Sequence, residues 1–226
     1  MLAGGCALAA GVASAQPPSA AAESPVIVDG LAAVLGDPSA LEEPRAVLRS
    51  DVELRARLSL LGRDANRALF GELPGSLLRA TLDQLLGEQL IALEAERVQI
   101  AKPKPGEVAA ELAAIEREAG GRRSILQLLA RLDASHVELE AMAERRALIG
   151  AFLRANLEGV NVVSEREIDE RMRADGARLE GQTPAAAREL IRAVLAREAL
   201  ARNIEHWVRV LRARTRVRVF AVFETP

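Results

Sequence analysis

The side chains that most often carry out catalysis or bind metals are scarce in this sequence and form no recognisable motif. Among 226 residues there are two histidines and one cysteine, too few for a zinc site built from these ligands. His136 follows a serine that we expect to begin a helix, and His206 lies beside Trp207 in the last helical segment. Histidines so placed more often pack or face solvent than act as a base and its partner. Since no glycine-rich phosphate loop, G-x-S-x-G or H-E-x-x-H motif occurs, we expect no catalytic residues, metal or cofactor.

Acidic residues are plentiful, but no two of them form a pair set apart for acid–base chemistry. They alternate with arginine or alanine along segments with helical spacing, as at Glu94, Glu96, Glu111, Glu116 and Glu118. This pattern is typical of solvated ion pairs between residues four apart on a helix. We therefore expect the protein not to be an enzyme.

The composition excludes nucleic-acid binding as the main activity. The sequence has 30 Lys and Arg against 32 Asp and Glu, a formal net charge of −2, whereas nucleic-acid binders need a basic excess. Aromatic residues make up 2%, which leaves few side chains to stack on bases. Half of the residues are hydrophobic, and most of these are aliphatic, which is enough for a sizeable core.

The first segment has the pattern of a targeting sequence. Residues 1–15 read MLAGGCALAAGVASA, which is apolar and ends in Ala-Ser-Ala before Gln16. This matches a secretory signal peptide and predicts cleavage after Ala15 and export to the periplasm. The usual basic stretch is missing, so a start upstream of Met1 stays open, as does lipid attachment at Cys6. Residues 16–25 are expected to form a flexible spacer.

Two segments near opposite ends of the chain have the pattern of β-strands. Residues 26–35 begin with β-branched side chains and stop at the turn pair Gly36-Asp37, while residues 214–219 alternate strictly and continue into an apolar run. A lone strand leaves its backbone groups unpaired, so we expect the two segments to pair with each other. Trp207, in the helix that precedes the second strand, is expected to be largely buried.

Every periodic segment between these strands is helical. Ser50, Ser135 and Ser164 are each followed three residues later by glutamate, and Thr183 precedes a proline; both patterns indicate helix starts. The expected helices begin at these residues or near residues 74, 106 and 125. The predicted fold is mainly α, with a small antiparallel β element that pairs the N- and C-terminal strands.

One stretch between the first two expected helices is apolar but lacks helical periodicity. Leu69, Phe70 and Leu73 lie between Gly62 and Pro74 and are expected in or near loops. If they are exposed, they are candidate client-binding residues. The alternative is that Phe70 anchors its loop in the core.

The order of these pieces resembles the non-catalytic core of the SurA family of periplasmic chaperones. Three stretches carry the resemblance: VDGLAAVLGD with RSDVE, LDQLLGEQLI with EAER and the helix start at residues 104–108, and WVRVLR followed by VRV. The resemblance implies a trigger-factor-like helical core over residues 26–223. Its helical part would be 26–175 and its closing helix and strand 184–223.

The sequence departs from that family at one place. SurA relatives usually insert parvulin-type prolyl isomerase domains before the closing helix, but residues 176–183 form a connector far too short for a folded domain. The resemblance therefore implies an exported holdase for unfolded envelope or outer-membrane proteins, without isomerase activity or cofactor. The alternative is a structural subunit of the cell envelope that holds one dedicated partner.

Overall fold

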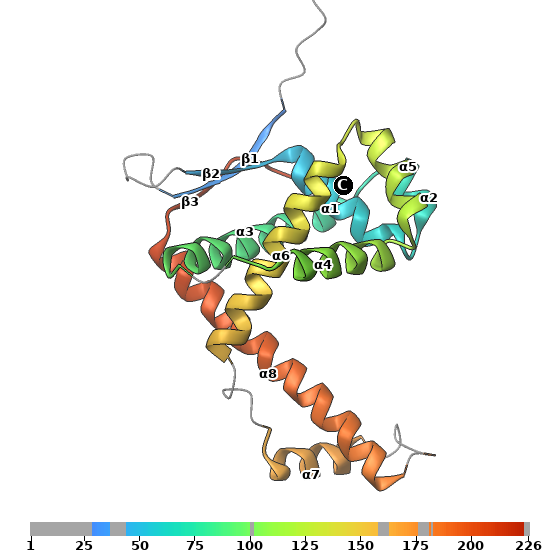
Figure 1. The fold of residues 1–226 in the computed structure, drawn as a ribbon, viewed down its shortest axis with the longest axis vertical. Helices are drawn as coiled ribbons and strands as arrows, with labels where there is room; N and C mark the ends of the chain where they lie inside the picture. Colours follow the sequence, from blue (N-terminus) through green and yellow to red (C-terminus); the bar gives the residue numbers. More distant parts are fainter. Residues whose placement is uncertain are drawn as a thin grey trace, which may run out of the picture.

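The computed structural model describes residues 29–36, 44–99, 102–157, 163–175, 181 and 183–223 (Figure 1). The predicted signal peptide and spacer, residues 1–15 and 16–25, lie outside the described residues. Within these ranges the protein is mainly helical with a small antiparallel sheet, which confirms the predicted fold class. The helices are α1 (Arg49–Leu61), α2 (Ala65–Phe70), α3 (Gly75–Arg97), α4 (Pro105–Glu118), α5 (Arg122–Leu132), α6 (His136–Leu157), α7 (Glu165–Ala174) and α8 (Pro184–Arg214).

The sheet joins the two ends of the described chain. Its strands are β1 (Leu31–Leu35), β2 (Arg45–Leu48) and β3 (Val217–Val219), in the order β2-β1-β3 with both pairs antiparallel. Leu35 lies opposite Val217 and Ala33 opposite Val219, so the predicted pairing of the terminal strands is confirmed. The register places Ala33, Leu35 and Val47 on the face that packs into the core.

Two apolar cores fill the body, which we define as the sheet, α1–α6 and the C-terminal part of α8. The first core lies between the sheet, α3, the end of α6 and α8; its largest fully buried side chains include Leu35, Leu86, Leu90 and Phe152. Trp207 packs on Phe152 with ring centroids 4.7 Å apart but is half-buried, less than the sequence suggested. The second core joins α1, α2, α4, α5 and the start of α6 around Ile115, Ile125 and Leu128.

The first half of α8 projects from the body and, together with α7, forms an arm (Figure 1). Helix α8 begins with Thr183 as N-cap and Pro184 in its first turn, as predicted. Helix α7 begins at Ser164, whose hydroxyl accepts from the Glu167 amide, also as predicted. None of the described helices combines the length and the apolar character needed to cross a membrane.

Three local expectations were wrong. Residues 65–70 form α2 rather than a loop, because Asp64 accepts the amide of Arg67 and so caps one short turn of helix. Helix α1 begins one residue before Ser50: the carboxylate of Asp51 accepts the Leu48 amide at 2.8 Å, so the expected Ser50 capping box is absent. Strand β2 lies between the two terminal strands, where the sequence predicted helices and no strand.

Candidate functional site

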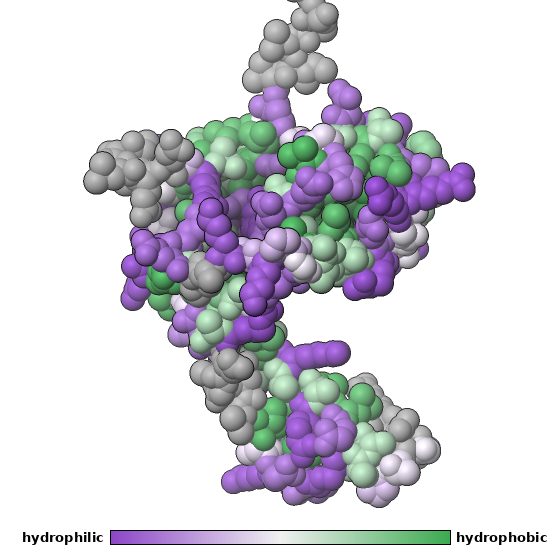
Figure 2. Space-filling model, in the orientation of Figure 1, coloured by the Kyte–Doolittle hydropathy of each residue, from purple (hydrophilic) through white to green (hydrophobic). Residues whose placement is uncertain are grey.

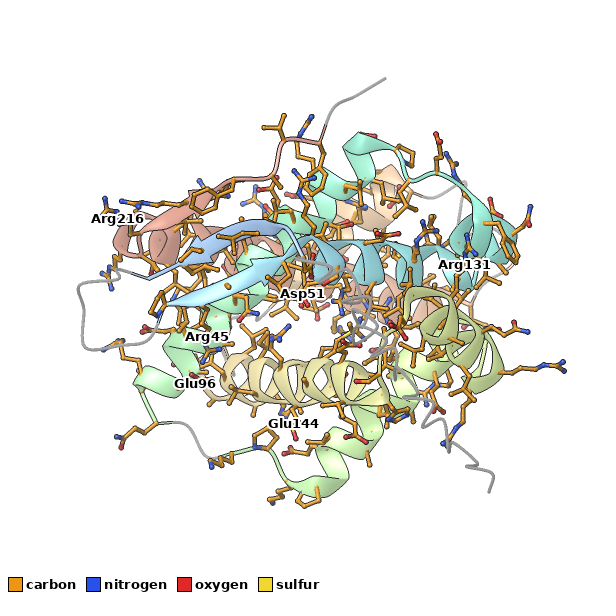
Figure 3. All side chains as sticks on the ribbon, turned by 90° about the horizontal axis from the view of Figure 1, so that it is seen from above. Arg45, Asp51, Glu96, Arg131, Glu144 and Arg216 are labelled. Atoms are coloured by element: carbon orange, nitrogen blue, oxygen red, sulfur yellow. The ribbon has the colours of Figure 1, made fainter. Side chains whose placement is uncertain are left out.

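The stretch predicted to bind clients ends in an exposed aromatic ring. Phe70 is the last residue of α2 and keeps 67% of its surface exposed. The guanidinium of Arg131, on α5, lies over the ring at 5.1 Å from its centroid; Figure 3 shows Arg131 at the α2–α5 end of the body. A ring held by a cation on one side is oriented without being buried. The alternative that Phe70 anchors its loop in the core is therefore wrong.

A partly buried arginine fixes the loop that follows Phe70. Arg57, on α1, donates through Nη1 to the carbonyl oxygens of Ala68 at 2.8 Å and Gly71 at 3.3 Å. Its Nε donates to Glu53 at 2.8 Å. Hydrogen bonds from a charged donor to carbonyls at the end of a helix satisfy groups that the helix itself leaves unpaired. Residues 71–74 are therefore held against α1.

Leu73 meets the opposite end of the chain in a shallow cavity of about 450 Å³. Leu73, Leu78 and Phe223 supply its apolar surface, while Arg49, Glu53, Arg57 and Glu72 stand around it. The carbonyl oxygen of Phe223 accepts from Nη2 of Arg79 at 2.7 Å, which ties the C-terminal segment to α3. The charged residues carry both signs, so the cavity has no strong net charge.

The segment after β3 adds further apolar side chains. The amides of Phe220 and Ala221 donate to the carbonyl of Ala32, at 2.9 and 3.1 Å, and Ala221 is buried in the first core. Phe220 and Val222, on either side of it, are 52% and 75% exposed. We call Phe70, Leu73, Phe220, Val222 and Phe223 the apolar lip. It contains three of the four phenylalanines in the sequence.

The three candidate residues have different surroundings in the structure. Phe70 is exposed, and Leu73 lines the cavity with Phe223, whereas Leu69 packs against the second core and does not belong to the lip. Sequence reasoning missed Phe220, Val222 and Phe223 as site residues because it assigned them to the closing strand. The alternation of Phe220 and Val222 with the small residue Ala221 was the available signal for these two, since alternate side chains of an extended segment face opposite sides.

The arm is separated from part of the body by a hollow, which Figure 2 shows. The two helices of the arm are joined to each other mainly where α7 faces the first half of α8. Charged groups join α7 to α8: Glu165 accepts from Arg188 at 2.5 Å and from Arg192 at 2.8 Å, and Arg188 also donates to Asp169 at 2.6 Å. The hydrogen bonds from Arg188 and Arg192 hold the pKa of Glu165 below the usual value of a glutamate. Ile168 on α7 is fully buried, and Ala187 and Ile191 are buried on α8, which packs against α7.

Metal ligands and sequence relatives give no further assignment. Within the described ranges, no group of three or more His, Cys, Asp or Glu side chains is arranged to hold a metal ion. No protein-family model matches the sequence, and no curated protein is significantly similar to it. Function is therefore inferred from the residues and their geometry.

Proposed function

We propose that the protein is an exported chaperone that holds unfolded or extended envelope polypeptides, outer-membrane proteins among them, in the periplasm. The observation that carries the proposal is the apolar lip. A chain with so few aromatic residues leaves Phe70 and Phe220 more than half exposed. Leu73 and Phe223 line one cavity, and each lies within three residues of an exposed apolar side chain, Phe70 or Phe220. Exposed apolar side chains of this kind are typical of surfaces that bind other molecules.

The composition of the apolar lip favours binding of many different polypeptides over binding of one specific sequence. Its side chains are apolar, and the charged residues around the cavity are of both signs, namely Arg49, Arg57, Glu53 and Glu72. Such a surface accepts apolar side chains from an extended chain without reading their order. Because these charged residues are of both signs, they repel neither acidic nor basic segments of a bound polypeptide. They also keep the edge of the cavity hydrated.

The architecture supports the same proposal. The paired terminal strands and the long closing helix follow the order of elements in the SurA resemblance. Helix α7 ends at Ala174 and packs against α8, which begins at Pro184, so the intervening segment is too short to fold as an isomerase domain. We therefore propose that the protein holds its clients passively, with no cofactor and no prolyl isomerisation.

Aggregation of a denatured outer-membrane protein, followed by light scattering after dilution from urea, tests the lip. We expect the double variant Phe70→Ser/Val222→Ser to lose protection several-fold, because both side chains are largely exposed and binding relies on burying them. Its melting temperature should stay within about 2 °C of wild type, since exposed substitutions change stability little. Leu190→Ser is the control: Leu190 is an apolar residue on the arm that is 53% exposed, and this variant should protect as wild type does.

Two results would contradict the proposal. If the lip variant protects as well as wild type, the lip is not the client surface. If wild type protects none of several unrelated denatured proteins but binds one native partner in fixed ratio, the protein is a dedicated subunit. Acceleration of X-Pro isomerisation in a test peptide would overturn the expected lack of isomerase activity.

A further inference from the structure

A second cavity, distinct from the apolar lip, lies where α1, α3, α4 and α6 meet. Its volume is about 490 Å³, within the range of small-molecule sites. The walls combine aliphatic side chains with several polar groups. They comprise Leu58, Leu77, Ala80, Ile115, Ala119 and Met142 together with Arg55, Ser59, Arg63, Thr81, Gln84, Glu118 and Arg146.

The innermost charged residue of this cavity is only partly paired. The side chain of Arg55 is 7% exposed, and its Nη2 donates to Oε1 of Glu88 at 2.5 Å. The same Oε1 accepts from Nε2 of Gln84 at 2.9 Å. Nη1 of Arg55 is buried and has no acceptor among the described residues. A buried donor without an acceptor is costly, so this group favours any ligand that brings one.

Positive groups outnumber negative ones among the charged residues that line the cavity. Three guanidinium groups, of Arg55, Arg63 and Arg146, line it. Two carboxylates oppose them: Glu88 accepts from Arg55, and Glu118 accepts from Nη1 of Arg146 at 3.1 Å. Burial lowers the pKa of the Arg55 guanidinium while Glu88 raises it, and an arginine keeps its charge at neutral pH.

One glycine brings two walls of the cavity together. Gly62 ends α1 so close to the end of α4 that a Cβ there would lie 2.1 Å from the carbonyl oxygen of Glu118. No side chain fits in that space, so only glycine allows this approach. Arg63 follows directly, and Glu118 and Ala119 belong to the facing segment.

We propose that this cavity binds a carboxylate joined to a small apolar group. An anion matches the excess of positive groups in the lining, and the planar guanidinium of Arg55 suits a carboxylate. The aliphatic walls take the apolar part of the ligand. The carboxylate comes either from a free carboxylic acid or from the C-terminus of a polypeptide that ends in an apolar residue.

Calorimetric titration with hexanoate tests the site directly. We expect hexanoate to bind at millimolar or lower concentration and the neutral hexanamide to bind at least tenfold more weakly. Acetyl-glycyl-leucine, as the free acid and as the amide, distinguishes the two sources. Tighter binding of the peptide acid than of hexanoate identifies a polypeptide C-terminus, and the reverse order identifies a free acid.

Two variants locate the binding without removing the positive charge at residue 55. Ser59 is exposed and its hydroxyl donates to the carbonyl oxygen of Ala56 on its own helix, so Ser59→Trp fills the cavity from its wall. Arg55→Lys keeps the charge but loses the forked donor. Both should weaken hexanoate binding at least tenfold, whereas Ser76→Trp, an exposed serine on α3 that is not part of the cavity wall, should bind as wild type.

Three outcomes would overturn the proposal. Equal binding of hexanoate and hexanamide would show an apolar cavity that does not recognise charge. Unchanged hexanoate affinity in Ser59→Trp would place the binding elsewhere. If neither hexanoate nor acetyl-glycyl-leucine binds to the wild-type protein, the cavity is not a carboxylate site. None of these results depends on whether the protein protects clients from aggregation.

Discussion

The body and the arm are parts of one chain that are held together in different ways. In the body, Leu35, Leu86 and Phe152 are almost completely shielded from water inside the first core. In the arm, Ile168 is the one side chain of α7 that is fully buried, and exposed Arg–Glu and Arg–Asp pairs also join α7 to α8. Apolar burial stabilises strongly and is insensitive to salt, whereas exposed ion pairs are weak and screened. The arm should therefore be the first part to loosen.

The largest expected effect in the body comes from removing its closing strand. A chain that stops after Ala213 loses β3, the buried Ala221 and the hydrogen bond from Arg79 to Phe223, and it uncovers the central strand β1. We expect a loss of at least about 4 kcal/mol in the free energy of unfolding. The melting temperature should fall by about 10 °C or more.

The control for this prediction is a chain that stops after Phe223 and keeps all of these contacts. It should melt as the full chain does. An unchanged melting temperature of the shorter chain would mean that the terminal strands do not stabilise each other. It would also contradict the view that the body is more stable than the arm.

The same substitution in each region sharpens the comparison. Ile125 in the second core is 2% exposed and Ile168 in the arm is fully buried. Ile125→Ser should cost about 3 kcal/mol of global stability, because it leaves a cavity and buries a hydroxyl. Ile168→Ser should instead release α7 from α8, so that amide hydrogen exchange speeds up in α7 alone and the melting temperature shifts by less than about 2 °C.

Exchange that speeds up equally throughout the chain in Ile168→Ser would contradict this expectation. It would show that body and arm unfold as one unit. Circular dichroism on both variants confirms that each is folded before exchange is measured.

How far the sequence predicted this molecule depended on the range of the interactions involved. Local sequence patterns predicted where α7 and α8 begin, because the hydroxyl groups of Ser164 and Thr183 accept hydrogen bonds from amides three residues later. The pairing of β1 with β3 was also predicted, because two lone strands need partners. Strand β2 was missed: four residues are too short to show alternation, and β2 depends on β1 for its hydrogen bonds.

The candidate site was predicted only in part, because some of its residues come together through long-range contacts. Phe70 and Leu73 stand out in sequence as apolar residues beside glycine and proline. Phe223, which lines the cavity with Leu73, is far away along the chain and joins Leu73 only through the fold. Arg55 gave no signal at all among many arginines, because its burial and its incomplete pairing arise from the packing of α1 against α3.

The smallest expected effect concerns Glu165, which joins α7 to both Arg188 and Arg192 on α8. Its pKa lies below the usual 4.5 because these arginines donate hydrogen bonds to the carboxylate. A lowered pKa means that the stabilisation is complete above the unfolded value and is lost as the pH falls through the folded value. The link therefore holds at neutral pH and weakens only in acid below about pH 4.5.

Glu165→Gln removes this link at every pH, so we expect slightly faster amide exchange in α7 at neutral pH and low salt. Raising the ionic strength to about 0.5 M should speed exchange in wild-type α7 but change the variant less, because screening acts on a charge that the variant lacks. Glu170→Gln is the matched control, since Glu170 pairs with Arg166 on α7 itself and does not reach α8. If α7 in wild type shows no salt dependence, or if Glu170→Gln loosens it as much as Glu165→Gln does, apolar contacts around Ile168 hold the arm and the contrast with the body disappears.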